Sequence, residues 1–387
     1  MFVLFAIIGL SILIFFHELG HFIVAKISGI KVEEFGIGYP PRFFGFVKVG
    51  GKRKMFFGKN EPRESKNTIY SLNWIPFGGF NKLKGELEKD QDPDSFRGAK
   101  WWKKFLVAVA GVAMNIIVAI LIFFILYSTG IPQDVDNVSE NAHVVEKIGV
   151  QVGSVVPDSP AQKQGLIMGD IIKTIDGKHF DEVEDFQNYT ATKKGESIEL
   201  GLQKNGRMVK KNIPVKSYDE VYSDISEIYK IDEADKKRGV IGAGLSKTAL
   251  VKYPFHSAFL RALKHVFGLA WQICAGIVLM ISSLITKGAA IGGVMGPVGI
   301  TKITAGIAEI GFLYLVQFLG LLSVAIAVFQ LIPFPALDGS RALFALIEGI
   351  KGKPIKYKTE NIIVSTGFLI LITILGFVTI KEVIGLF

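Results

Sequence analysis

The sequence predicts a multi-pass α-helical membrane protein with four transmembrane helices, a membrane-associated β-hairpin and an inserted α+β domain. Half of the 387 residues are hydrophobic and only 20% are charged, whereas soluble domains carry about 25% charged residues. The mean hydropathy is +0.40, and the apolar residues gather in long runs. This composition excludes an ordinary cytosolic enzyme, a disordered tail and a fibrous protein. A stretch of short alternating segments between two of the runs is typical of a soluble domain with a sheet.

Four apolar runs predict the transmembrane helices. Each is close to the ~20 residues that a helix needs to cross ~30 Å of hydrocarbon. The four runs are Phe2–Ala25, Phe105–Tyr127, Phe312–Ile332 and Ile362–Ile380.

The single Cys274 excludes a disulfide framework and a multi-cysteine metal site.

The charges of the short loops predict the orientation of these helices, because cytoplasmic loops carry an excess of Lys and Arg. The stretches Lys26–Lys104 and Arg341–Lys358 are rich in basic residues and are expected in the cytoplasm. The segment from Ser128 to about Pro254 is then outside, and an odd number of crossings must return the chain. A fifth apolar run, Val266–Thr286, is therefore expected to form a surface or interfacial helix pair. We interpret the net charge of +9 as loops beside anionic membrane lipid, with no nucleic acid bound.

Two segments between the helices are expected to contain strands. Residues 142–215 alternate short β-type runs with turn signals such as Asp176-Gly177, which predicts a compact soluble domain. The Gly- and Phe-rich stretch Gly36–Phe57 predicts a hairpin beside the membrane, where non-helical backbone needs cover by protein or a water-filled cavity. The expected segments are 1–26 (first transmembrane helix), 27–104 (cytoplasmic hairpin region), 105–127 (second transmembrane helix), 142–245 (extracytoplasmic domain and its extension), 246–311 (interfacial or surface helices), 312–338 (third transmembrane helix and Leu-Asp-Gly motif), 339–361 (cytoplasmic loop) and 362–387 (fourth transmembrane helix).

The first apolar run ends in the motif His17-Glu18-Leu19-Gly20-His21. Residues i and i+4 share one face of a helix, so the imidazoles of His17 and His21 can bind one metal ion. Neutral imidazole nitrogens are ligands that zinc accepts. Glu18 lies about 100° around the helix from His17, where it can act on a water molecule as general base. Ionisable groups in an apolar span are costly unless they are partnered and used, which favours a metal site inside the membrane over a chance match.

A catalytic zinc site needs a third protein ligand, and Asp338 is the candidate that the sequence favours. Pro333 and Pro335 break the third run near its end, and the unwound chain can direct the Asp338 carboxylate back to the metal. The alternative role is an N-cap for the helix that follows. Asn115 is the sole strongly polar residue of the second run, which fits either a donor to the oxyanion of the reaction or an interhelical hydrogen bond.

These residues resemble the site-2 protease family of intramembrane zinc metalloproteases. The branch most similar to this chain is the bacterial one with a periplasm-facing PDZ domain, the regulator-of-sigma-E protease type. The resemblance rests on the His-Glu-x-x-His motif of the first run together with Pro-x-Pro-x-Leu-Asp-Gly after the third, and it extends over most of the chain. The sequence departs from the family in Gln330, where Asn is common, and in Val112, where Pro is common. Further similar segments are Trp74–Phe80, Ala110–Asn115, Gly296–Ile300 and, for the bacterial PDZ pattern, Ser159–Ile172 with Ile175–Gly177.

The resemblance implies an endopeptidase in the plasma (inner) membrane of a bacterium that cuts single-span membrane proteins in or near their transmembrane segments. The substrates it suggests are anti-sigma factors and remnant signal peptides, and the cofactor is Zn²⁺. The implied site consists of the zinc ligands His17, His21 and Asp338, the general base Glu18, and Asn115 and Gln330 as candidates for contacts to the substrate or oxyanion.

The PDZ pattern implies that a peptide C-terminus, or a partner protein, binds by strand addition beside a helix. The sequence leaves two binding loops open, Ile148-Gly149 or, in a circularly permuted domain, Gly239–Gly242. Two other functions are alternatives: a metal-binding membrane transporter and a PDZ scaffold without proteolysis. A transporter predicts polar residues along several spans and repeated halves, and a scaffold needs no general base at Glu18.

Overall fold

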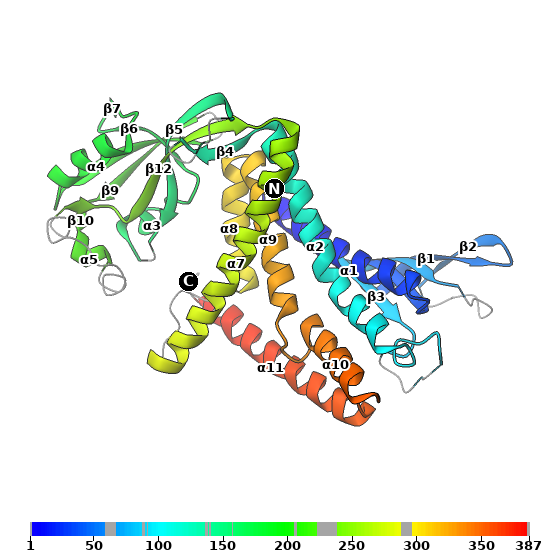
Figure 1. Ribbon diagram of the computed structural model, residues 1–387. Coiled ribbons are helices and arrows are strands. Elements are labelled where there is room, and N and C mark those ends of the chain that lie inside the picture. The colour runs from blue at the N-terminus through cyan, green and yellow to red at the C-terminus, as the bar shows by residue number, and fades with distance from the viewer. Residues whose placement is uncertain are drawn as a thin grey trace.

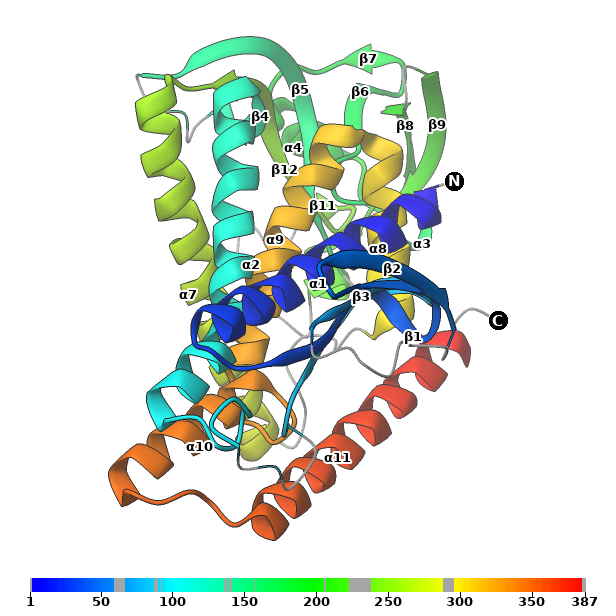
Figure 2. The same cartoon turned by 90° about the vertical axis from the view of Figure 1, so that its right-hand side faces the viewer.

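The computed structural model describes residues 2–58, 67–86, 90, 92–135, 138, 141–156, 158–204, 207–222, 238–287 and 296–384. A bundle of long helices carries a small sheet beside its first helix and a larger sheet domain at one end (Figures 1 and 2). Three buried apolar clusters hold these parts together. One joins the helices to the strands that enter and leave the sheet domain, one fills that domain, and one lies between the first helix and the small sheet.

Among the described residues, five helices are long and apolar enough to cross a membrane, one more than the four expected. Four of them cover the predicted runs, and the fifth covers the run that was expected at the surface. Two shorter helices lie on either side of α9 in the sequence. The five long helices are α1 (Phe2–Ile27), α2 (Trp101–Thr129), α7 (Phe255–Lys287), α9 (Phe312–Leu331) and α11 (Tyr357–Ile384), and the shorter ones are α8 (Pro297–Ile310) and α10 (Asp338–Lys351).

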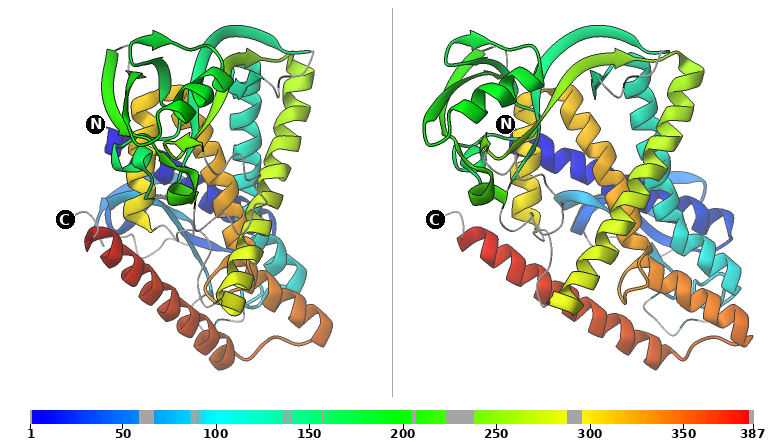
Figure 3. Two further views of the ribbon diagram at one scale, coloured as in Figure 1. Left: turned by 90° about the vertical axis from the view of Figure 1, so that its left-hand side faces the viewer. Right: turned by 60° about the vertical axis from the view of Figure 1, so that its left-hand side comes forward.

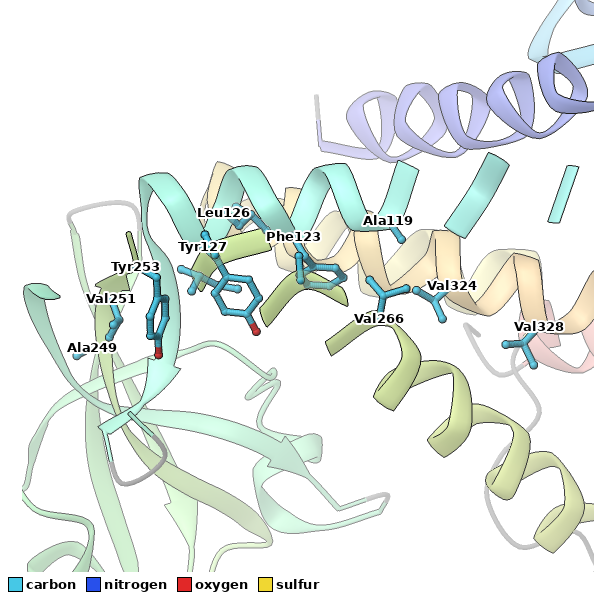
Figure 4. Packing of buried hydrophobic residues seen from close by; sticks show 13 residues of the cluster. Ala119, Phe123, Leu126, Tyr127, Ala249, Val251, Tyr253, Val266, Val324 and Val328 are labelled. Atoms are coloured by element: carbon cyan, nitrogen blue, oxygen red, sulfur yellow. The ribbon is translucent and has the colours of Figure 1, made fainter. Parts of the chain in front are cut away.

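The helix α7 corrects the expectation of a helix pair within 266–286. It is one continuous helix of 33 residues that runs beside α2 near the sheet domain (Figure 3). Val266 of α7 and Phe123 of α2 belong to one buried cluster (Figure 4), and the Tyr253 amide donates to the Tyr127 carbonyl at 2.8 Å where α2 ends and α7 begins. The second helix of this region is α8, which lies outside 266–286 but within the stretch 246–311 expected to hold interfacial or surface helices. Whether α7 crosses the bilayer stays a prediction from the loop charges.

The small sheet packs against α1 and contains the predicted hairpin of β1 (Val32–Val49) and β2 (Lys52–Phe57). Its third strand, β3 (Ile69–Leu83), was not predicted, because one proline and two glycines in its middle interrupt the alternation of apolar and polar residues. The first half of β1 pairs with both halves of β3, so the sheet curls. The Ser11 hydroxyl of α1 donates to the Pro76 carbonyl at 3.4 Å, which ties the bend of β3 to this helix.

The sheet domain is built from residues 131–252 and is longer at both ends than the predicted 142–245. The strands β5, β6, β8 and β9 lie in the stretch 142–215, where short β-type runs were expected. The additional strands β4 and β12 follow α2 and precede α7 directly, so both connections to the helices are part of the same sheet, in the order β4-β12-β5-β6-β8-β9 with β7 beside β6. The bounds are β4 (Ile131–Asp134), β5 (His143–Val155), α3 (Pro160–Lys163), β6 (Ile171–Ile175), β7 (Lys178–His179), α4 (Val183–Thr192), β8 (Ser197–Lys204), β9 (Arg207–Pro214), β10 (Lys216–Ser217), α5 (Tyr218–Tyr222), β11 (Gly239–Val240) and β12 (Ala243–Lys252).

The sheet domain also rests on the adjoining ends of α8 and α9. The Gln151 side-chain amide donates to the Tyr314 hydroxyl of α9 at 2.9 Å. Gly169 faces the end of α8 so closely that a Cβ there would lie 2.4 Å from Cδ1 of Ile310. These contacts fix the domain at the end of the bundle where α2 finishes and α9 begins.

Candidate metal centre and active site

The three candidate zinc ligands meet in the structure. The Nε2 atoms of His17 and His21 lie 2.9 and 3.1 Å from Oδ2 of Asp338, and the two nitrogens are 3.2 Å apart. His17 is 4% exposed and His21 is 9% exposed, so both imidazoles are shielded from bulk solvent. Within the described ranges, this is the one group of three His, Cys, Asp or Glu side chains whose ligand atoms can share a metal ion.

The triangle formed by these atoms fits a zinc ion. Bonds of about 2.0–2.1 Å at the tetrahedral angle separate two ligand atoms by about 3.3 Å, and the observed separations are 2.9, 3.1 and 3.2 Å. Two neutral imidazoles with one carboxylate form a ligand set that catalytic zinc sites use, with the fourth position left for water. The residues present therefore fit the metal that the motif predicts.

A break between α9 and α10 brings Asp338 to the imidazoles of α1. The helix α9 ends at Leu331, because Pro333 has no N–H for a helical hydrogen bond and restricts the residue before it. The chain then turns sharply, and a Cβ at Gly339 would lie 2.2 Å from the Leu331 carbonyl oxygen, so only glycine fits there. Asp338 is the first residue of α10, whose N-cap is Leu337. The Asp338 carboxylate faces the imidazoles, and the alternative role as an N-cap is not seen.

Both imidazoles are oriented by atoms of α2. Nδ1 of His21 lies 2.7 Å from the Val107 carbonyl oxygen, so this nitrogen carries the proton and donates it, and Nε2 keeps its lone pair for a metal. Nδ1 of His17 lies 3.2 Å from the side-chain amide of Asn115, which is completely buried. The Ser323 hydroxyl of α9 donates to the main-chain carbonyl of Asn115 at 2.8 Å and holds this part of α2 in place.

Gly111 is part of the site, although its sequence pattern predicts no role for it. It lies on α2 between Val107 and Asn115, opposite the two imidazoles. A Cβ at this position would lie 2.4 Å from Nε2 of His21 and 2.7 Å from Nε2 of His17. Only a residue without a side chain therefore lets the α2 backbone lie this close to the two imidazole nitrogens. The signal that could have revealed it is a small residue one turn before the lone polar Asn115, on the same face of the helix.

The remaining predicted site residues lie near the ligands in different ways. Glu18 is half-buried on α1 and directly follows His17 in the chain. Gln330 is half-buried in the last turn of α9, just before the break that leads to Asp338.

Of the two segments that the sequence suggests for peptide binding, only one forms a turn in the structure. Gly149 lies inside β5, paired with Thr248 of β12, so Ile148-Gly149 is not a loop. The segment Gly239–Gly242 forms β11 and the turn into β12, and a Cβ at Gly239 would lie 2.5 Å from the Thr190 carbonyl of α4. The strand β4 covers only the second half of β12. The half that follows the turn therefore has no strand on its second edge among the described residues.

The chain is similar to known proteins along nearly its whole length. The model of Peptidase family M50 matches residues 5–374. A Clostridium perfringens protein named "Putative zinc metalloprotease" is 34% identical over 99% of this chain and 99% of its own length. A protein of the same name from Clostridium acetobutylicum is 29% identical over 98% of this chain and 96% of its own length. The PDZ domain of an SdrC-like protein from Listeria monocytogenes is 26% identical, covers 25% of this chain and 87% of that domain, and gives a TM-score of 0.20.

The family model and the curated relatives support a zinc metalloprotease, and the described residues include several helices of membrane-spanning length. Because the family model covers nearly the whole sequence, the chain belongs to peptidase family M50, the site-2 protease family.

Proposed function

We propose that this chain is an intramembrane zinc endopeptidase that cuts single-span membrane proteins in or near their transmembrane segments. The observation that carries the proposal is the meeting of His17 and His21 of α1 with Asp338 beside the end of α9. Both helices have the length and hydropathy of membrane spans. A hydrolytic centre held between such helices suits a substrate whose scissile bond lies in the bilayer.

Each residue has a role in this mechanism. His17, His21 and Asp338 hold the zinc ion, which when bound polarises the scissile carbonyl and makes water acidic enough to react near neutral pH. Glu18 takes a proton from the attacking water and gives it to the nitrogen of the leaving amine as the C–N bond breaks. The products are one new carboxylate and one new amine, so the step consumes one water molecule.

Two polar residues support this chemistry in different places. The Asn115 amide lies at Nδ1 of His17, so we assign it the orientation of that ligand through α2. If Nε2 of His17 is the ligand atom, Nδ1 would carry the ring proton, and Oδ1 of Asn115 could accept a hydrogen bond from this N–H after a half turn of the amide. Gln330 stays the candidate for a hydrogen bond to the substrate or oxyanion. Its amide matches the function of the family's Asn on a longer side chain.

The substrate must be extended before it is cut, because the carbonyl groups of a helix are already hydrogen-bonded. The small sheet offers a strand edge for this purpose, since β2 pairs only with β1 among the strands that the structure describes. Strand addition there supplies main-chain hydrogen bonds without regard to side chains. The same arrangement allows one enzyme to act on varied transmembrane segments, with anti-sigma factors and remnant signal peptides as the classes that the family resemblance suggests.

The sheet domain is proposed to be a circularly permuted PDZ domain outside the cytoplasm of a bacterial cell. The uncovered half of β12, the turn at Gly239–Gly242 and the neighbouring α4 provide the strand edge, loop and helix that peptide C-termini need. The basic loops at the other end of α2 favour this orientation in the plasma membrane.

The proposal is tested with the purified full chain in liposomes that also contain a single-span substrate. Cleavage within the span is expected, and it should stop when a chelator removes zinc and return when zinc is added. A substrate with the same flanks and a soluble segment in place of the span serves as the control and should not be cut. Cleavage that persists without metal, or that ignores the span, would overturn the proposal.

A further inference from the structure

A buried ion pair fastens α10, the helix that carries Asp338, to α2. Nζ of Lys104 lies 2.7 Å from Oε2 of Glu348, and the two side chains are only 8% and 11% exposed. Oε1 of Glu348 accepts the amide of Ile355 at 3.0 Å, which holds the loop after α10 as well. The next residue of α10 has no side chain, and a Cβ at Gly349 would lie 2.7 Å from the Trp101 ring. The two helices are thus in contact around this charge pair.

The ion pair lies on the same face of α2 as the atoms that orient the imidazoles. Lys104 precedes Val107, Gly111 and Asn115 by three, seven and eleven residues, which are spacings along one helix face. One helix therefore contacts His21 through Val107, both ligands at Gly111, His17 through Asn115, and α10 through Lys104. A shift of α10 by one residue along its axis would move Asp338 by about 1.5 Å. Zinc–ligand distances tolerate only about ±0.2 Å.

A second ion pair fastens the beginning of α10. Nη1 of Arg341 lies 2.5 Å from Oε1 of Glu86, in the segment that follows β3. Arg341 is one turn from Asp338, and Glu348 is in the last part of the same helix. The two pairs hold α10 near both ends, to two different elements, so the helix cannot slide or pivot without breaking one of them.

We propose that Lys104 and Glu348 are positioning residues of the metal centre, which set α10 against α2 so that Asp338 completes the zinc site. This inference rests on the proposed function of His17, His21 and Asp338 as zinc ligands. The charge pair lies outside the group of ligand atoms and acts only through the placement of α10. Its contribution should therefore appear in zinc affinity, separately from the loss of stability that breaking a buried ion pair causes.

The test measures zinc affinity of the full chain in detergent by competition with a chromogenic chelator, well below the melting temperature of each variant. Glu348→Gln keeps the shape of the side chain and removes its charge, and about 10–100-fold weaker zinc binding is expected, as for other groups that orient ligands. The exchange Lys104→Glu with Glu348→Lys restores the attraction. It also puts the acidic group near the start of α2 and the basic group near the end of α10, as the helix dipoles favour. Affinity within about threefold of wild type is expected for the exchanged pair.

Glu360→Gln is the matched control. It breaks the 2.6 Å pair between Arg97 and Glu360, which joins α11 and not α10 to the same region, so zinc affinity should not change. Unchanged affinity in Glu348→Gln would overturn the positioning role while leaving the zinc ligands in place. Failure of the exchanged pair to recover zinc affinity while its melting temperature is normal would also overturn it. Failure of the wild-type chain to bind zinc would instead overturn the proposed function itself.

Discussion

Replacing Gly111 with alanine tests the geometry of the metal centre through a single methyl group. The new Cβ would lie 2.4 Å from Nε2 of His21, whereas ordinary contacts begin at 3.4 Å, so one group must move by about 1 Å. The imidazole cannot turn freely, because its Nδ1 is held 2.7 Å from the Val107 carbonyl. A displacement of about 1 Å is several times the tolerance of a zinc–nitrogen bond. We therefore expect the bond to be lost and zinc affinity to fall by at least about 100-fold.

The assay is chelator competition for zinc together with cleavage of a single-span substrate. Gly376→Ala in α11 is the control, because a Cβ there meets nothing within 4 Å. It should leave zinc affinity and cleavage unchanged and stabilise the helix by at most ~1 kcal/mol. Wild-type zinc affinity in Gly111→Ala would refute the inference that the backbone of α2 closes on the imidazole nitrogens.

Three further predictions concern the surroundings of this centre. Asn115→Ala should weaken zinc binding about 10–100-fold, measured by the same competition; unchanged zinc affinity with a lower kcat would instead assign it to the oxyanion. The second prediction compares proline at Lys54 with proline at Met55 of β2. Successive N–H groups point to opposite edges of a strand, so only one of the two positions removes a donor from the free edge, and that variant should cleave substrate more slowly at normal zinc content. Equal cleavage by both variants and wild type would exclude strand addition at β2. Gly242→Ala should reduce binding of C-terminal peptides, measured by fluorescence anisotropy, since its Cβ would lie 2.3 Å from Cβ of Ser159, whereas Gly177→Ala has a similarly positive φ in open space and should not. Equal losses in both glycine variants would mean that backbone strain, and not the turn before β12, is responsible.

The parts of the site that the sequence predicts are those encoded by local patterns. The proposed ligands His17 and His21 follow from the spacing of the motif on a helix. Asp338 follows from the prolines before it together with the need of a catalytic zinc for a third ligand. Residues whose importance lies in what they exclude leave a much weaker signal. Gly111 is one of these, because a glycine is common in apolar helices and only the facing imidazoles make it necessary.

Contacts between distant segments explain the other features of the structure that the sequence does not predict. Lys104 and Glu348 are 244 residues apart, and each alone suggests an ordinary surface charge beside a membrane. The strand β3 was missed because it bends and pairs with β1 along both of its halves, so neither half shows the regular alternation of a half-buried strand. The helix α7 is continuous where a helix pair was expected, because loop charges constrain the number of crossings and not the breaks within a helix.

The most direct test of the proposed chemistry is cleavage of a single-span substrate by Glu18→Gln in liposomes, with the zinc content of the same preparation measured alongside. Glu18 is the one ionisable residue of the motif that is not a proposed metal ligand. Zinc content equal to wild type with cleavage reduced by about 10²–10⁴-fold is the predicted result. Comparable cleavage by the variant and the wild-type chain would contradict the assignment of Glu18 as general base and, with it, the proposed mechanism.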